Sequence, residues 1–159
     1  MGVSTDGILC FGIWFDEGHT FPWDKKPYNG DHEEWWKDQC GFKPLFKLYD
    51  DTETGYANNK RPSDKEINKY YEHKSKFEEK HPPPFEVIFH CSDSYTMYIL
   101  AVPGQEFTAS RGEAVKINPA KLKVPEKKTK KLIDFCKKYK IRYSRKKTDP
   151  QWYLCSYWG

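Results

Sequence analysis

The chain has 159 residues, of which 37% are hydrophobic, 17% aromatic and 31% charged, with a net charge of +4. This length suits one domain with a single core, and no apolar run approaches the roughly eighteen residues that a membrane-spanning helix needs. Because the N-terminal residues also lack the basic start of a secretory signal, we expect a soluble cytoplasmic protein that makes no contact with a membrane.

The first third of the chain predicts a strand, a short helix and a second strand. Residues 7–15 form a continuous apolar run rich in β-branched and aromatic side chains, which is typical of a central strand covered on both faces. Asp31 suits an N-cap with Glu34 three residues later, and Gly41 suits the end of the helix that follows. Residues 44–50 are a candidate strand.

The middle of the chain predicts a long helix followed by a hairpin. Ser63 and Glu66 have the spacing of a capping box, and three prolines end the helix, which we place at about residues 64–80. Residues 85–91 and 95–102 are rich in β-forming side chains and are joined by three polar residues, so they predict two paired strands.

The last third predicts a short strand, a basic helix and a closing strand. Residues 114–118 favour the short strand. Leu132 and Cys136 fall on one face of a helix at about 126–139, and residues 152–158 read as the final strand.

This order of elements predicts an α+β fold in a single domain, residues 1–159, with a mixed or mainly antiparallel sheet and two main helices. Both faces of the closing strand are apolar, as they are in the opening strand. We therefore expect the N- and C-terminal strands to lie side by side in the centre of the sheet, with both faces buried. The terminus is then part of the core and not a binding site.

The chemical motifs of common enzymes and metal sites are absent from the sequence. Five scattered cysteines include no Cys-x-x-Cys pair, which predicts reduced, packed thiols. His90 and Cys91 are neighbours in a strand and point to opposite faces, which argues against a nucleophile and base pair. The acidic loop near His19 leaves metal binding or acid-base catalysis open, although a polar surface loop is simpler. We predict no catalytic residue, no metal and no cofactor.

Several segments resemble a family of small uncharacterised accessory proteins of tailed bacteriophages and prophages. They are STDGILCFGIWF (4–15), FPWD (21–24), EEWW (33–36), MYILAVPG (97–104), SRG (110–112) and WYLCSYWG (152–159). The resemblance implies a phage protein that acts in the host cytoplasm. It implies binding to a host protein, such as a component of a defence system, in the manner of an anti-CRISPR protein.

The tryptophans of the acidic first third are the candidates for contacting a protein partner. Trp23, Trp35 and Trp36 lie among carboxylates in a loop and a short helix, where an aromatic ring suits an interface anchor. Packing in the core is the alternative, and one of the adjacent pair Trp35 and Trp36 is expected in the core with the other at its rim. The acidic first third beside a basic remainder also leaves self-association open.

A basic block at residues 121–147 supports the alternative function, binding of a nucleic acid or nucleotide. It holds 13 Lys and Arg residues against Glu126 and Asp134. Lysines on one face of the predicted helix are expected to track phosphates unless that face is simply solvated. The candidate phosphate-binding residues are Arg111, Lys127, Lys130, Lys131, Lys137, Lys138, Arg142 and Arg145.

Overall fold

The computed structural model describes residues 5–48, 61–92, 95–141 and 150–158. The chain forms two compact units, one of residues Met1–Pro22 and Pro84–Gly159, and one of residues Trp23–Pro83. We call them the sheet unit and the helical unit and describe each by itself. Helices and a mixed sheet together confirm the α+β fold class, whereas the single domain of residues 1–159 stays a prediction.

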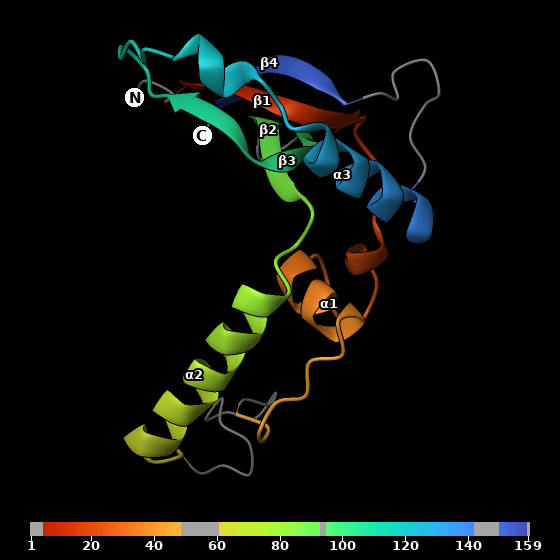
Figure 1. Cartoon of the computed structure of the whole chain (residues 1–159), viewed down its shortest axis with the longest axis vertical. Helices are drawn as coiled ribbons and strands as arrows, with labels where there is room; N and C mark the ends of the chain where they lie inside the picture. The colour runs from red at the N-terminus through yellow and green to blue at the C-terminus, as the bar shows by residue number, and fades with distance from the viewer. Residues whose placement is uncertain (1–4, 49–60, 93–94, 142–149, 159) are drawn as a thin grey trace. The chain divides into compact units, whose positions relative to one another are not determined.

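The sheet unit holds the four strands, which are β1 (Thr5–Phe15), β2 (Glu86–Ser92), β3 (Tyr95–Ala109) and β4 (Gln151–Trp158). Their order is β1-β3-β2-β4, and the sheet closes on itself because β4 also meets β2 (Figure 1). Every pairing is antiparallel except the short parallel contact between β2 and β4. The predicted side-by-side pairing of the terminal strands is confirmed, since β1 runs antiparallel to β4 from Thr5 and Trp158 to Gly12 and Gln151.

Gly12 allows β1 to approach β3 closely at an irregularity in their pairing. The register between the two strands shifts between Cys10 and Gly12. A Cβ atom at position 12 would lie 2.3 Å from the carbonyl oxygen of Leu100, a distance that no real Cβ contact tolerates. The absence of a side chain at Gly12 is therefore a condition for the sheet to form in this register.

The inner face of the sheet carries one cluster of core residues. Its buried members are Ile8, Cys10, Ile88, Ile99 and Ala101, and Trp14, Tyr153, Cys155 and Tyr157 pack against them while partly exposed. The inner-face residues of β1 and β4 alternate with outward-facing ones, as the two-residue period of a strand requires. Four strands are enough to enclose this core, because β3 pairs with both β1 and β2.

Helix α3 (Glu126–Lys138) belongs to the sheet unit and follows the short 3-10 helix η3 (Pro119–Leu122). Leu132, Phe135 and Cys136 are its buried residues, and the Phe135 ring lies 4.5 Å from that of Phe85. Lys128 Nζ donates a hydrogen bond of 2.9 Å to the Pro103 carbonyl oxygen in β3, which ties the start of the helix to the sheet. The predicted helix is confirmed, but Phe135 was not foreseen as its main aromatic anchor.

The helical unit holds α1 (His32–Gln39) and α2 (Asp64–Lys80), and the predicted caps of both are confirmed. The Asp31 side chain accepts a hydrogen bond from the Glu34 backbone at 2.8 Å. Ser63 and Glu66 form the reciprocal bonds of a capping box at the start of α2. A third polar feature is Lys37, which is 5% exposed and whose ammonium lies 2.7 Å from the Glu34 carboxylate.

Two predicted strands are wrong. Residues 44–48 are described and form an irregular segment, and residues 114–118 lead irregularly into η3. Neither segment has a strand beside it to complete its backbone hydrogen bonds, and Leu48 is buried from a loop instead. Residues 49 and 50 of the predicted strand 44–50 lie outside the described residues. Within the described residues, no helix is long and apolar enough to cross a membrane.

The expected burial of both faces of the terminal strand is also wrong. On the outer face of β4, Leu154 is 82% exposed and Trp158 is 56% exposed. No described element lies over this part of the strand. The strand is therefore central in its pairing, with β1 on one side and β2 on the other, while its outer face meets solvent.

Candidate functional site

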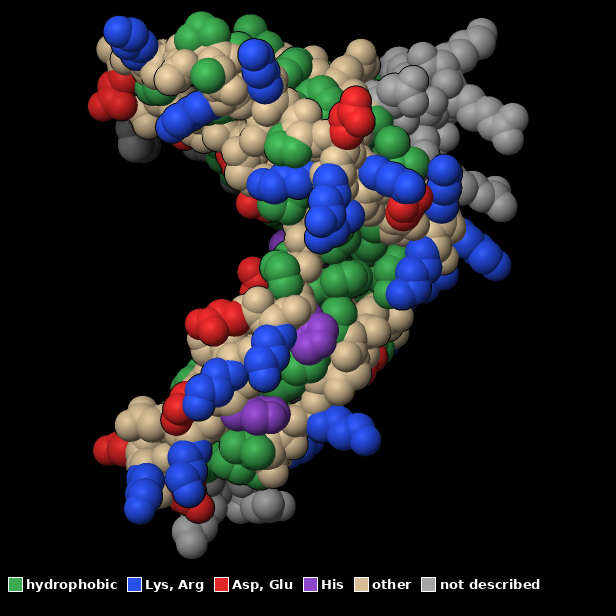
Figure 2. Space-filling view, viewed as in Figure 1, with side chains coloured by type: hydrophobic (Ala, Val, Ile, Leu, Met, Phe, Trp, Pro, Cys, Tyr) green, Lys and Arg blue, Asp and Glu red, His purple; other side chains and the backbone are tan. Residues whose placement is uncertain are grey.

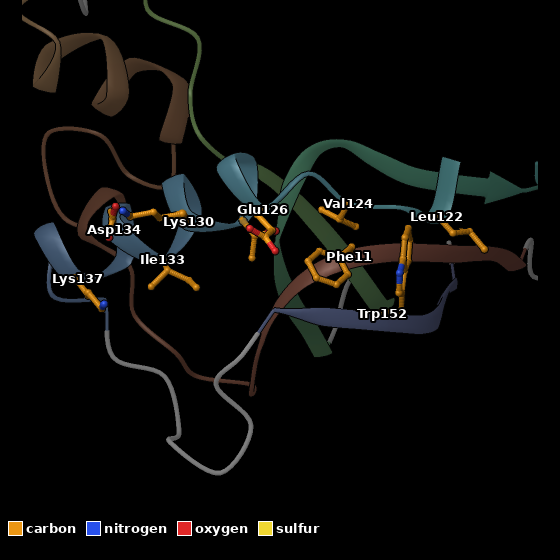
Figure 3. A pocket seen from close by; sticks show the side chains of 10 residues that line it. Phe11, Leu122, Val124, Glu126, Lys130, Ile133, Asp134, Lys137 and Trp152 are labelled. Carbon is orange, nitrogen blue, oxygen red and sulfur yellow. The ribbon is translucent and has the colours of Figure 1, made fainter. Parts of the chain in front are cut away.

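A groove runs between α3 and the outer face of the terminal strands in the sheet unit. It has a volume of about 550 Å³ and is open to solvent (Figure 3). Its lining residues come from β1, from the segment around η3, from α3 and from β4. They are Phe11, Leu122, Val124, Glu126, Thr129, Lys130, Ile133, Asp134, Lys137 and Trp152.

Aromatic rings form the strand side of the groove. Phe11 and Trp152 are opposite each other in the pairing of β1 with β4, and their ring centroids are 5.5 Å apart in an edge-to-face arrangement. The Trp152 ring also lies 6.1 Å from that of Phe107 in β3. All three residues are half-buried, so each ring is held by its neighbours and keeps a surface in solvent. Such rings suit stacking on a flat apolar ligand.

Lysines form the helix side of the groove. Lys130 and Lys137 are two helical turns apart, line the groove with their side chains and are exposed (Figure 3). The predicted stripe is confirmed as an exposed face of α3, and it consists of Lys127, Lys130, Lys131, Lys137 and Lys138. Figure 2 shows Lys and Arg side chains gathered over this helix.

Two carboxylates reduce the positive charge of the groove. Asp134 lies beside Lys130 on α3, and Glu126 stands at the start of the helix opposite Phe11 (Figure 3). Both acids are exposed, and with five exposed lysines on the stripe the helix keeps a net positive face. The groove thus joins an apolar aromatic wall to a wall of mainly positive charge.

The three tryptophans predicted to contact a protein partner do not form one exposed site. Trp23 and Trp35 are 2% and 4% exposed, and their ring centroids lie 5.2 Å apart, so they are core residues of the helical unit. Trp36 is half-buried, and its indole nitrogen donates a hydrogen bond of 2.9 Å to the His81 carbonyl oxygen. The split of the adjacent pair into one core and one rim residue is as expected, but two of the three rings offer no surface to a partner.

The remaining predicted phosphate-binding residues are not brought to the groove. Arg111 is exposed in a turn after β3 and is not among the residues that line the groove. Arg142 and Arg145 lie outside the described residues. Of the described members of this set, Lys130 and Lys137 line the groove, while Lys138 lies over the Tyr139 ring with its ammonium 4.9 Å from the ring centroid.

The acidic loop after β1 shows no sign of a metal site. In the described parts of the chain, no group of three or more His, Cys, Asp or Glu side chains has the geometry to hold a metal ion. The His19 ring packs instead between Phe15 and Phe21, at centroid distances of 4.5 and 4.6 Å. Aromatic contacts thus anchor the loop at His19, which the sequence interpretation of a polar surface loop did not include, while Asp16, Glu17 and Asp24 are exposed.

The thiols and the buried histidine are packed groups. All five cysteines are free. Cys10 and Cys155 share the inner face, and a hydrogen bond from one thiol to the other, with burial, raises the pKa of Cys10. Burial lowers the pKa of His90, which is 7% exposed. These shifts keep Cys10 and His90 neutral at pH 7, as expected for core residues.

Sequence reasoning missed the contribution of the C-terminal strand to the site. Trp152 and Phe11 are expected in the core because their strands are apolar on both faces, and Phe107 lies beyond the predicted strand 95–102, which in the structure extends to Ala109. The sequence did contain a clue. It predicts no further amphipathic element that could cover the outer face of the closing strand. Comparisons with protein-family models, with curated proteins and with solved structures found no match to this chain.

Proposed function

We propose that the protein is a nucleic-acid-binding protein that holds its ligand in the groove between α3 and the terminal strands. The observation that carries the proposal is the placement of Lys130 and Lys137 on the same groove as Trp152 and Phe11. Lysine ammonium groups pair with phosphates, and aromatic rings offer a surface to bases. The protein acts by binding, and no step of bond making or breaking is required of these residues.

The electrostatics of α3 support a phosphate backbone as the charged part of the ligand. The five lysines of the stripe are exposed, whereas Lys128 on the same helix is occupied by its bond to the Pro103 carbonyl oxygen. Lys130 and Lys137 are separated by about 10 Å along the helix axis, which lets them hold two points of one backbone. Glu126, opposite Phe11, repels phosphates from the aromatic wall, whereas Asp134 stands between the two lysines and reduces the attraction that they exert on a phosphate.

A salt titration of a charge-reversal variant tests this proposal. Fluorescence anisotropy with a labelled 20-nucleotide oligomer should show binding whose logarithmic affinity falls linearly with the logarithm of salt concentration. The double variant Lys130→Glu/Lys137→Glu should lose about tenfold or more in affinity at low salt, and its salt slope should be about one to two units shallower.

The matched control is Lys65→Glu/Lys69→Glu, which makes the same change in net charge on exposed positions of α2. This control should change the affinity by less than about twofold, because its lysines lie outside the groove. Equal losses in the two double variants would contradict a defined site, and absence of binding by the unchanged protein at 50 mM salt would end the proposal.

A second candidate function follows from the exposed apolar residues of β4. We propose it as the alternative: a phage accessory protein that binds a host protein, a defence component, in the host cytoplasm. Leu154 and Trp158 are the exposed large side chains of the outer face, and apolar side chains rimmed by polar ones are typical of protein interfaces. Trp36 remains at the rim of the helical unit, while Trp23 and Trp35 no longer serve this role.

Affinity capture from infected host cells separates the two functions. If the outer face binds a host protein, Leu154→Lys should lose one specific captured protein that Leu45→Lys retains, since Leu45 is 55% exposed in the helical unit. Captured nucleic acid that is lost in the charge-reversal variant instead favours the first function. Retention of every captured protein by Leu154→Lys would argue against the host-protein interface.

A further inference from the structure

The groove is polarised, with charge on one wall and rings on the other. Lys130 and Lys137 stand on α3, while Phe11 and Trp152 stand on the paired strands β1 and β4 (Figure 3). A nucleic acid that fills both walls must present phosphates on one side and bare base faces on the other. Single strands can do this, whereas a duplex keeps its base faces stacked inside and offers only phosphates and groove edges.

We propose that the ligand of this groove is a single-stranded nucleic acid whose bases stack on Trp152 and its neighbouring rings. This inference rests on the proposed function and names the class of ligand. The Trp152 indole is fixed by an edge-to-face contact with Phe11 and a tilted contact with Phe107, so its orientation is set before any ligand binds. A preorganised ring loses little conformational freedom when a base stacks on it.

The outer face of β4 extends the stacking surface beyond the groove. Outward side chains on a strand recur about every 7 Å, and on β4 they are Trp152, Leu154, Ser156 and Trp158. Leu154 and Trp158 are open to solvent, and the described residues include no element over them. An extended strand can therefore lay successive bases along β4 while its backbone follows the lysine edge at one end. Both RNA and DNA have this chemistry, because a base face is common to the two.

The test compares single-stranded and duplex oligomers of the same sequence, as DNA and as RNA, against the full chain and two variants. Trp152→Leu keeps an apolar side chain of strand-compatible size and removes the ring. Its affinity for the single strand should fall about 5- to 100-fold, the range for one lost base stack, while duplex affinity changes less than about twofold. Trp152→Phe should retain single-strand affinity within about threefold.

Phe107→Leu keeps the test decisive if Trp152→Leu fails to fold, which circular dichroism will show. Phe107 lies on β3, across β1 from β4, with its ring 6.1 Å from that of Trp152, and its loss should weaken single-strand binding in the same selective way. Binding of the single strand by the unchanged protein should also quench tryptophan fluorescence, and Trp152→Phe should reduce that quenching while leaving the part that comes from Trp158.

The failures are distinguishable. If no oligomer binds, the proposed function itself fails. If duplex binds as tightly as single strand and the Trp152 variants weaken neither, the groove binds phosphates only and the stacking inference is overturned while the proposed function stands. If the protein dimerises through the outer face, so that light scattering shows a dimer that Trp152→Leu makes monomeric, the rings are an interface between copies and the inference is also overturned.

Discussion

The two faces of the paired strands β1 and β4 are equally apolar in sequence and opposite in environment. Ile8 and Cys10 on the inner face are 6% and 0% exposed, whereas Leu154 on the outer face is 82% exposed. The inner residues pack against β2 and β3 because the sheet closes on itself. On the outer face, Leu154 and Trp158 of β4 have no described element over them, whereas Ile13 and Phe15 further along β1 are 0% and 3% exposed. An apolar strand face indicates that another layer should cover it. Whether the chain itself provides that layer depends on how many layers its other elements form.

The largest expected effect comes from adding a side chain at Gly12, where the inner face is closest to a neighbouring backbone. Gly12→Val would place a Cβ 2.3 Å from the Leu100 carbonyl oxygen, and the strand cannot yield without breaking its pairing with β3. We expect a loss of more than about 4 kcal/mol in the free energy of unfolding, measured by urea denaturation. Gly7→Val on the same strand is the control, because a Cβ added there would lie 3.8 Å from the Ala109 carbonyl oxygen, an ordinary contact, and equal losses in both would contradict the close approach at Gly12.

Truncation of an inner-face side chain is the next largest effect. Ile8→Ala removes buried methyl groups from the core and should cost about 2 to 5 kcal/mol in the free energy of unfolding. The same urea denaturation gives the value, and an unchanged denaturant slope will show that the folded state is otherwise intact. A cost below about 0.5 kcal/mol would mean that the inner face is not the core.

The buried histidine on the inner side gives a pH-dependent effect of intermediate size. Burial holds the pKa of His90 below its ordinary value of 6.5. As the pH falls through 6.5 the unfolded chain therefore takes up a proton first, and stability is lost below that pH by at most about 1.4 kcal/mol per unit. At a pH well above 6.5 both states are neutral at this residue, and His90 then contributes no pH dependence.

The variant His90→Gln should remove this part of the pH dependence. Between pH 7 and pH 5 the unchanged protein should lose more stability than the variant, measured as the shift in the midpoint of thermal unfolding. Identical losses in the two proteins would show that His90 is protonated as easily in the folded state as in the unfolded one.

The smallest expected effect is on the outer face. Leu154→Ala should change the free energy of unfolding by less than about 0.5 kcal/mol, because the side chain is already in water. Comparison with Ile8→Ala by the same denaturation then measures how unlike the two faces are. A cost at Leu154 similar to that at Ile8 would show that another copy of the chain, or another molecule, covers the outer face in solution.

The sequence predicted the elements whose signals are local. The Ser63 and Glu66 capping box placed the start of α2 correctly, and the Asp31 cap did so for α1. The strand predicted from the apolar run of β1 and its pairing with the last strand were also correct. Both strands carry a strong apolar pattern, which indicates a position inside the sheet. In these cases the information lies within a few residues or in a strong pattern.

The errors concern features that depend on distant parts of the chain. Residues 44–50 have the composition of a strand, but a strand must also pair with the edge of a sheet. The four strands form a closed sheet, which leaves no edge for a further strand. The polar neighbours of Trp23 made it a candidate partner contact with core packing as the alternative, and its ring packs in the core on that of Trp35. The lysines of α3 were found by periodicity, but their proximity to Trp152 depends on how the helix crosses the strands.

The pairing of β1 with β4 also has a consequence for how the protein is made. Ile8 and Cys155 are partners in this pairing and lie 147 positions apart in the chain. Nearly the whole chain must leave the ribosome before β1 can gain this neighbour, and pairing over such a distance is slow. During that interval β1 exposes both an unpaired backbone edge and apolar side chains. This combination favours aggregation with other incompletely folded chains. Yield of soluble protein should therefore depend on the rate of synthesis more than on the stability of the finished fold.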